Sequence, residues 1–241
     1  MGDIRINGSG SMTGGDYQRV VINGAGRCDG LFSAERIEVN GSFHCPGILK
    51  SGLVIASGSF RCDGAMKSDD LNVSGSLKCG GRLEAGRVRC SGAMSVECDV
   101  AVQELDVSGS LKVSSARLEA DRVACSGSLR VSGQISADEV KVTGMVNARE
   151  IVGDRVIIHS GKIPWRQFLP GKLLAGLTSQ AGLVEATVVE LEGVTAETVN
   201  GQDVTIGPNC IIQRVDCSGT LFIHPTSSVA QVTGEYTKRE A

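Results

Sequence analysis

Residues 54–62 read VIASGSFRC and residues 71–79 read LNVSGSLKC, and this pattern decides the fold. Each stretch centres on a glycine, with apolar residues two and four positions before it and two and four positions after it. The glycines that mark the frame are Gly24, Gly41, Gly58, Gly75, Gly92, Gly109, Gly127, Gly144 and Gly161. Their spacing is constant, except that one extra position falls between Gly109 and Gly127. Such self-similarity at a fixed period predicts a repeat architecture.

The alternation of apolar and polar residues within each period predicts strands with one buried face. A helix is disfavoured because no stripe recurs at helical spacing, and a glycine in every period would cost a helix about 1 kcal/mol. Two further bends are expected in each period, one near Gly47 and its equivalents and one at charged pairs such as Asp69-Asp70. Three short faces separated by three bends predict an all-β fold, a three-faced parallel β-helix with about 17 residues per rung.

Composition fits such a narrow core. Aromatic residues make up only 3% of the chain, because little room for large rings is expected inside each rung. The net charge of −3 lacks the basic footprint of a nucleic-acid-binding protein, so no nucleic-acid partner is expected. The N-terminal residues lack the apolar core of a signal peptide, and no apolar run reaches the roughly 18 residues of a spanning helix. We therefore expect a cytoplasmic protein.

The chain has nine cysteines, and most follow the repeat. One column contains Cys28, Cys45, Cys62 and Cys79, and a second inward column contains Cys90 and Cys125. Free cysteine behaves as a small buried hydrophobe, so we expect reduced core thiols. A metal or redox ladder is the alternative, although tetrahedral zinc requires convergent ligands rather than a straight file.

The start, interruption and end of the repeat pattern divide the chain into five parts. They are a flexible leader (1–16), β-helix rungs (17–163), a non-repeat insertion (164–182), C-terminal rungs (183–235) and a polar tail (236–241). The insertion contains Trp165, Phe168 and Leu169 among prolines and glycines, which disfavour a regular strand or helix. It is either a loop or short helix folded back over the rungs, or a contact surface for a partner or a neighbouring subunit.

The outward column three positions after the glycine is basic. Its basic members are Arg27, His44, Arg61, Lys78, Lys112 and Arg130. These residues, called the basic file below, form either a solvated strand face or a stripe for anionic lipid, an acidic partner or a cell-envelope polymer. The same frame, continued to the last part of the chain, assigns Phe222 to this column as an exposed aromatic contact.

Signals for an enzyme are poor. The three histidines lie at unrelated phases of the repeat, and no phosphate-binding loop, nucleophile elbow or metalloprotease motif occurs. A hexapeptide acyltransferase would have a slightly longer rung, a multiple of six, and a catalytic histidine in a subunit cleft, and neither feature is found. We therefore expect no catalytic residue, no cofactor and no metal.

Two signatures give a family resemblance. Residues 6–26 read INGSGSMTGGDYQRVVINGAG and residues 199–225 read VNGQDVTIGPNCIIQRVDCSGTLFIHP. With the repeated units between them, they resemble the bactofilin family, and in particular its longer polymer-forming members from Gram-positive spore formers. The resemblance implies a right-handed β-helix that polymerises end to end without nucleotide, forming cytoplasmic scaffolds for cell shape, envelope enzymes or motility structures.

The resemblance also implies partners and a location. The partners would be further copies of the chain, a paralogous bactofilin, and a membrane-associated or envelope protein at the inner face of the cell membrane. Physics favours assembly independently, because each end of a β-helix is an unpaired sheet edge and no capping helix is evident. The alternative function is a binding module that recruits a partner through the insertion or the basic file.

Overall fold

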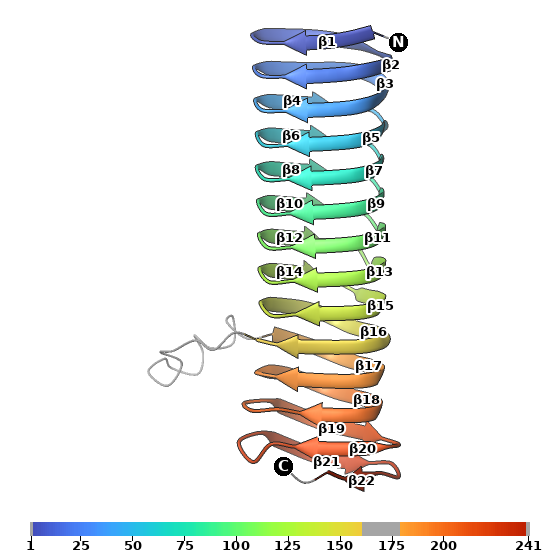
Figure 1. The fold of residues 1–241 in the computed structure, drawn as a ribbon, viewed down its shortest axis with the longest axis vertical. Coiled ribbons are helices and arrows are strands. Elements are labelled where there is room, and N and C mark those ends of the chain that lie inside the picture. The colour runs from blue at the N-terminus through green and yellow to red at the C-terminus, as the bar shows by residue number, and fades with distance from the viewer. Residues whose placement is uncertain (1, 161–178, 240–241) are drawn as a thin grey trace, which may run out of the picture. The chain divides into compact units, whose positions relative to one another are not determined.

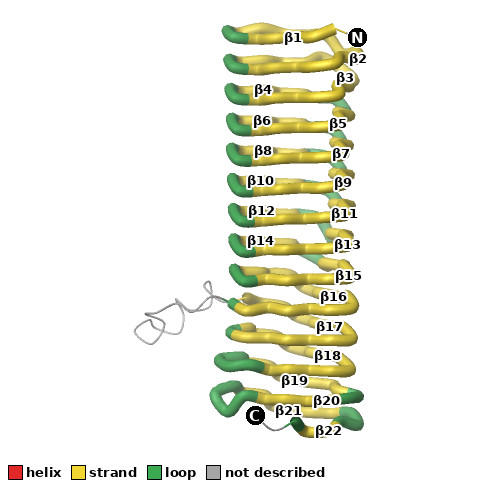
Figure 2. The backbone as a smooth tube through the Cα atoms, viewed as in Figure 1, coloured by secondary structure: helices red, strands yellow, loops and turns green. Residues whose placement is uncertain are grey.

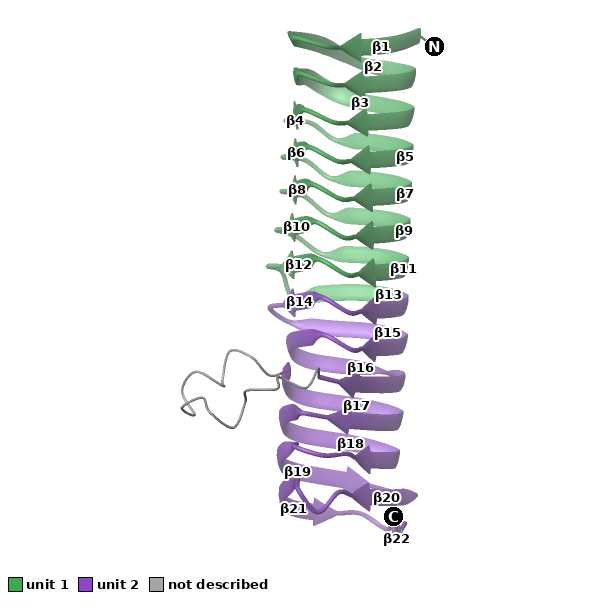
Figure 3. Cartoon of the chain, turned by 60° about the vertical axis from the view of Figure 1, so that its left-hand side comes forward, with its two compact units in different colours: residues 1–120 green, residues 121–241 purple. Residues whose placement is uncertain are grey.

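The computed structural model describes residues 2–160 and 179–239, which form β-strands joined by tight corners, with no helix among them. The chain divides into two compact units, residues 1–120 and residues 121–241 (Figure 3). In each unit the strands stack in parallel on the preceding and following turns of the same unit. The predicted fold class is therefore confirmed: each unit is a parallel β-solenoid.

Unit 1 contains twelve complete strands (Figure 1). Their bounds are β1 (Gly2–Ile6), β2 (Ser9–Ile22), β3 (Ala25–Val39), β4 (Ser42–Cys45), β5 (Leu49–Ala56), β6 (Ser59–Cys62), β7 (Met66–Val73), β8 (Ser76–Cys79), β9 (Leu83–Cys90), β10 (Ala93–Val96), β11 (Val100–Val107) and β12 (Ser110–Val113). From β4 onward each turn is one short strand followed by one longer strand. Phe43 pairs with Phe60, and Phe60 pairs with Leu77, so the turns repeat at the interval of the sequence frame.

The longer strands bend at their middle. Ser51 pairs with Ser68, but the next pair is Leu53 with Asp70, so Gly52 and Asp69 stand outside the ladder. The same interruption falls at Gly86 in the next turn. This is the predicted third corner, and it divides each turn into three faces. The corner at the glycine of the repeat frame recurs on every turn of unit 1 as a loop between strands (Figure 2).

The repeat-frame glycines are required by close packing between turns. A Cβ atom on Gly75 would lie 2.6 Å from the carbonyl carbon of Ser57 in the preceding turn, and closer still to the carbonyl oxygens of Ser57 and Gly58. The backbone is held there, since the amide nitrogens of Ser74 and Gly75 both donate to Ala56 O at 2.9 Å. A side chain at this corner would therefore separate the two turns.

Like side chains stack on like inside unit 1. Phe43 pairs with Phe60, and their ring centroids lie 5.3 Å apart. Leu77, Met94 and Leu111 continue this column in later turns. Phe32 belongs to a second inward column, where it pairs with Leu49, and its ring packs against that of Phe43 at 5.9 Å. Each of the three phenylalanine rings is at most 2% exposed. Full burial of such a side chain contributes about 1.5–3 kcal/mol, and a single turn could not bury its apolar row alone.

Unit 2 contains the remaining strands, and β13 includes the boundary between the units. Their bounds are β13 (Arg117–Cys125), β14 (Ser128–Val131), β15 (Gln134–Val142), β16 (Met145–His159), β17 (Ser179–Glu192), β18 (Val194–Ile206), β19 (Ile211–Cys217), β20 (Thr220–Ile223), β21 (Ser228–Thr233) and β22 (Thr237–Lys238). Turn length varies in this unit. The turn that joins Leu191 to its partner Ile206 is shorter than the regular one, whereas Ile206 and its partner Ile223 keep the regular interval.

The solenoid of unit 2 continues directly across the gap in the described chain. Asn147 of β16 pairs with Gln180 of β17, and the Ser160 hydroxyl donates to the Ser179 hydroxyl at 2.6 Å. Ser179 is fully buried and also accepts a hydrogen bond from Val146 N at 3.1 Å. Residues 160 and 179 are therefore neighbours, and the turns on either side pair as if they were consecutive.

Three predicted boundaries differ from the structure. Residues 1–16 are not a flexible leader, because β1 and the first half of β2 belong to the sheet. The C-terminal rungs begin at Ser179 rather than at residue 183, and β22 within the predicted tail pairs with β20. The leader was misassigned because its turn contains glycines, Gly10 and Gly15, in columns that later turns fill with large apolar residues.

Candidate functional site

The edge formed by β1 and the first half of β2 is an open sheet edge of unit 1 within the described chain. β1 pairs with residues 17–22 of β2, and residues 9–13 of β2 pair with β3 alone, so within the described chain their other sides have no partner. Ile4 and Ile6 point inward but are only half-buried, unlike the fully buried Ile22 one turn later. An unpaired strand with a partly covered apolar row is a template for another chain.

The hydrogen-bonding groups of β1 divide between its two sides. Ile6 O accepts from Asn23 N at 2.8 Å, so Ile6 faces β2. In a parallel ladder successive residues direct their N–H and C=O groups to opposite neighbours. The N–H and C=O groups of Asp3 and Arg5 therefore point away from β2, toward the open edge.

The last strands of unit 2 form a different kind of edge. β21 pairs with β19, and the very short β22 pairs with β20. Pro225 lies in the turn before β21, and the charged residues Lys238 and Arg239 are exposed. Short strands, proline and lysine are features that limit edge-to-edge pairing. The edge at β1 continues into residues 9–13 of β2 and contains no proline.

The basic file is aligned in unit 1 as predicted. Arg27 pairs with His44, His44 with Arg61, Arg61 with Lys78, and Lys112 follows one turn after Ser95. Arg130 occupies the equivalent place in unit 2, where it pairs with Asn147. Within unit 1 the register thus places these side chains above one another on the outer face of the sheet.

Carboxylates neutralise much of this file. Asp63 contacts His44 Nε2 at 2.7 Å and Arg61 Nε at 2.6 Å, and the hydrogen bonds from His44 and then Arg61 hold the pKa of Asp63 below its ordinary value. Lys78 Nζ lies 2.7 Å from Glu97, whose pKa its hydrogen bond likewise lowers. The file is therefore largely an ion-pair ladder, which weakens the interpretation as a stripe for a polyanion.

Phe222 does not belong to the basic file, so that prediction was wrong. It pairs with Thr205, which pairs with Glu190, a column that lies before the corner rather than after it. Phe222 is half-buried rather than fully exposed. Residues 215–223 imitate the repeat frame in sequence, but Cys217 pairs with Gly201 and Gly201 pairs with Ala186, so Gly219 stands at the third corner rather than at the first. The other predicted contacts, Trp165, Phe168 and Leu169, lie outside the described residues.

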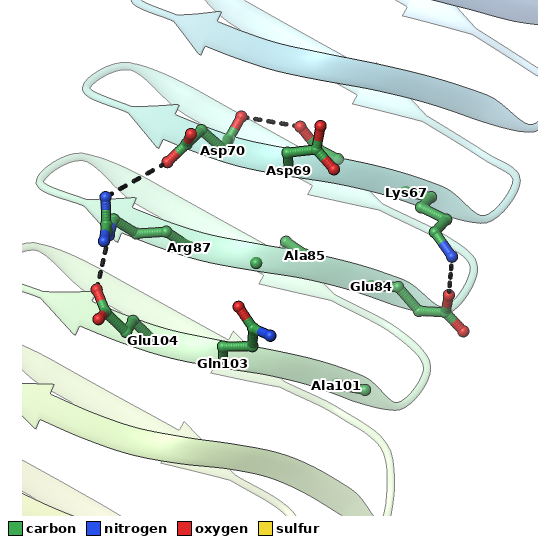
Figure 4. Close-up of a pocket in the computed structure, with 11 residues that line it drawn as sticks. Lys67, Asp69, Asp70, Glu84, Ala85, Arg87, Ala101, Gln103 and Glu104 are labelled. Atoms are coloured by element: carbon green, nitrogen blue, oxygen red, sulfur yellow. Dashed lines mark hydrogen bonds and ion pairs between the residues drawn. The ribbon is translucent and has the colours of Figure 1, made fainter.

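A hollow of about 560 Å³ lies along the third corner of unit 1 (Figure 4). Its floor contains Ala85, Gly86 and Ala101, and side chains of three consecutive turns line its sides. Arg87 Nε donates to Glu104 at 2.6 Å, and its Nη1 lies 3.9 Å from Asp70. The hollow exists because Gly86 contributes no side chain at a corner where neighbouring turns have Asp69 and Gln103. It is open and shallow, and its charges are mostly paired with one another.

The cysteine file of unit 1, defined here as Cys28, Cys45, Cys62 and Cys79, is aligned and fully buried. Cys45 pairs with Cys62 and Cys62 pairs with Cys79, and the pairing of Arg27 with His44 places Cys28 next to Cys45. All nine cysteines of the chain are free thiols. Burial raises the pKa of Cys28 to about 11, and the neighbouring thiols of Cys45 and Cys79 raise the pKa of Cys62. The thiols therefore form one continuous column, in which Cys45 Sγ donates to Gly47 O at 3.6 Å and Cys62 Sγ to Gly64 O at 3.5 Å.

Residues 2–160 and 179–239 also bear on metal binding and on membrane insertion. No group of three or more histidine, cysteine, aspartate or glutamate side chains converges there in a way that could hold a metal ion. The same residues contain no helix long and apolar enough to cross a bilayer.

Sequence reasoning missed the edge at β1. The signal was present, since Ile4, Ile6 and Asn7-Gly8 repeat, one turn earlier, the pattern of Val20, Ile22 and Asn23-Gly24. The structure confirms this match, because Ala25 N donates to Gly8 O at 2.9 Å.

Comparison with known proteins adds little on function. No known family model matches the chain, and no solved structure matches it. One stretch of 79 residues is 34% identical to the uncharacterized protein YhbE of Bacillus subtilis (strain 168). That match covers 33% of this chain and 31% of the relative, so it spans about a third of each protein.

Proposed function

We propose that this protein is a bactofilin-like cytoskeletal scaffold that self-assembles through its open sheet edges into nucleotide-independent filaments. The filaments support cell shape, envelope or motility structures in the cytoplasm, at or near the inner face of the membrane, and the protein is not an enzyme. The β-solenoid fold is compatible with such a scaffold. The observation that carries the proposal is the edge at β1, where backbone groups and a half-buried apolar row are left without a partner within the described chain.

The interactions that would join two copies are the same as those that join successive turns within one chain. Each added turn pairs its backbone with the preceding turn and covers its apolar row. A second copy placed against β1 would accept and donate hydrogen bonds at Asp3 and Arg5 and would cover Ile4 and Ile6. No nucleotide is needed, because strand pairing itself drives the addition.

Substitution of Arg5 provides a sharp test. Arg5→Pro removes an N–H group that points to the open edge, and it costs no hydrogen bond within the chain because that group does not face β2. Arg5→Ala is the matched control, since it removes the charge but keeps the N–H group. We expect filaments from the parent protein and from Arg5→Ala in negative-stain electron microscopy, and mainly short oligomers from Arg5→Pro.

Sedimentation velocity and circular dichroism complete the experiment. Equal thermal unfolding of the three proteins would show that the folded chain is intact, so that any difference lies in assembly. A parent protein that stays monomeric at high concentration would refute the scaffold proposal. Filaments of Arg5→Pro that match those of the parent would refute the role of the β1 edge.

A binding module remains the second candidate, favoured by the hollow at Gly86. Its small floor residues and its border of Asp69 and Gln103 offer polar contacts to an extended segment of another protein. Asp69→Ala/Gln103→Ala would remove this polar border without adding an atom next to the backbone. Loss of partner capture with filaments unchanged would favour this function over assembly.

A further inference from the structure

Core packing alone does not require cysteine at the four positions of the cysteine file. The same inward position is occupied by Val96, which pairs with Cys79, and then by Val113. Both valines are fully buried, as the four cysteines are. Because valine fills this position in the same fold, the run of cysteines in four consecutive turns is not needed to fill space.

The spacing of the file matches a two-coordinate metal ion. Neighbouring strands lie about 4.8 Å apart, and paired side chains of parallel strands project side by side. Two metal–thiolate bonds of about 2.3 Å placed end to end span about 4.6 Å. A straight file cannot supply four convergent ligands to zinc, but each neighbouring pair of sulfur atoms can hold one ion between them.

The surroundings of the thiols favour a cation. Cys62 Sγ lies 3.5 Å from the carbonyl oxygens of both Gly47 and Gly64, and Cys79 Sγ lies 3.3 Å from Gly81 O. These carbonyl groups come from the second corner, directly after the short strands, and their partial negative charges point toward the sulfur atoms. Local opening of a corner loop, rather than of a strand, would let an ion reach the thiols.

We propose that the cysteine file is a binding site for a soft monovalent metal ion such as Cu(I) or Ag(I), held in two-coordinate fashion between thiols of successive turns. Soft thiolate ligands select such ions over harder ones. One ion binds a pair of thiols by replacing one proton, so that a thiolate and a thiol share the ion and the site stays neutral. Four cysteines offer three such gaps, at 28–45, 45–62 and 62–79.

Ag(I) is the probe, because it is not redox-active under the conditions of the assay. The reduced full-length protein is titrated with Ag(I), desalted, and analysed for metal content and for released protons. Cys45→Val/Cys62→Val removes every neighbouring pair while using the residue found at positions 96 and 113. The matched control Cys90→Val/Cys98→Ser removes two thiols outside the file, and Cys90 has Val73 and Val107 as its neighbours.

The parent protein and the control are expected to retain about two or more Ag(I) ions per chain, with about one proton released for each ion. The file variant should retain them at least about tenfold more weakly, and bound Ag(I) should raise the thermal midpoint of the parent but not of this variant. Val96→Cys extends the file by one turn and should add about one ion, which tests the proposal without removing any thiol.

Two results would overturn the proposal. One is equal Ag(I) retention by the parent and by the Cys45→Val/Cys62→Val variant, provided circular dichroism shows both folded. The other is unchanged retention in Val96→Cys. Loss of all Ag(I) from the parent on desalting would also refute the proposal, since the cysteine file would then have only a role in core packing.

Discussion

Replacement of Gly75 by alanine tests the stacking geometry most directly. The new Cβ atom would lie 2.6 Å from Ser57 C and would overlap the oxygens of Ser57 and Gly58, whereas ordinary contacts of a Cβ atom begin near 3.4 Å. To restore ordinary contact, the two turns must separate by about 1 Å at this corner. That movement strains the hydrogen bonds from Gly75 N to Ala56 O and from Ser76 N to Gly58 O, both 2.9 Å.

The expected cost combines overpacking with weakened backbone hydrogen bonds. Overpacking in a rigid site costs about 1–3 kcal/mol, and each buried hydrogen bond that is lost costs about 1 kcal/mol more. We expect about 3 kcal/mol of lost stability, which lowers the thermal midpoint of a chain of this size by about 6–12 °C. Thermal denaturation followed by circular dichroism measures this shift.

Gly8→Ala is the matched control for Gly75→Ala. Gly8 has the same place in the first turn, but a Cβ atom there would meet nothing within 4 Å. Its thermal midpoint should stay within about 2 °C of the parent, because exposed substitutions away from special features change stability little. The reasoning fails if Gly75→Ala unfolds at the same temperature as Gly8→Ala, since the carbonyl contacts would then not constrain the corner.

The remaining predictions concern the basic file and the insertion. The lowered pKa of Asp63 means that its carboxylate adds stability above its unfolded pKa, and that this contribution is lost as the pH falls through the lower folded pKa. Between pH 6 and pH 3 the parent should therefore lose more thermal stability than Asp63→Asn, and equal losses would show that the pairs with His44 and Arg61 are energetically silent. Replacement of residues 161–178 by a Gly-Ser link should leave the thermal midpoint within a few degrees, because Ser160 and Ser179 are already in contact. A large drop would show that those residues help to hold the turns of unit 2 together.

Most of the fold could be predicted because the repeat indicates both the type of secondary structure and the place of each side chain within a turn. Once Gly41, Gly58 and Gly75 define the frame, alternation assigns each neighbour to the inside or the outside, and the structure places Phe43, Phe60 and Leu77 in one column. The cysteine file and the basic file of unit 1 followed from the same count. A period that stays constant from turn to turn needs no tertiary information.

The failures occurred where the period changes. The first turn is slightly shorter and has Gly10 and Gly15 at positions that later turns fill with larger side chains, so its strands resembled a linker. The turn before Ile206 is also shorter, and the sequence around Gly219 imitates the repeat frame at the third corner, so Phe222 was assigned to the wrong column. In that region Gly193 has a φ of 67° and Asn209 a φ of 60°, which allow tighter corners than the regular frame. Counting residues along the sequence cannot detect such a shorter turn, because the omission of a residue produces no recognisable sequence pattern.

The two kinds of contact that unite the turns respond differently to solution conditions, and this bears on assembly. The ion pairs of the basic file lie on the surface, where each contributes little and salt screens it. The contacts offered by the β1 edge are backbone hydrogen bonds and the apolar row of Ile4 and Ile6, which salt does not screen. Addition of a further copy at that edge should therefore persist at high ionic strength even where the surface ladder is weakened. Filaments that dissolved in moderate salt would indicate that charged side chains, and not strand pairing, hold the copies together.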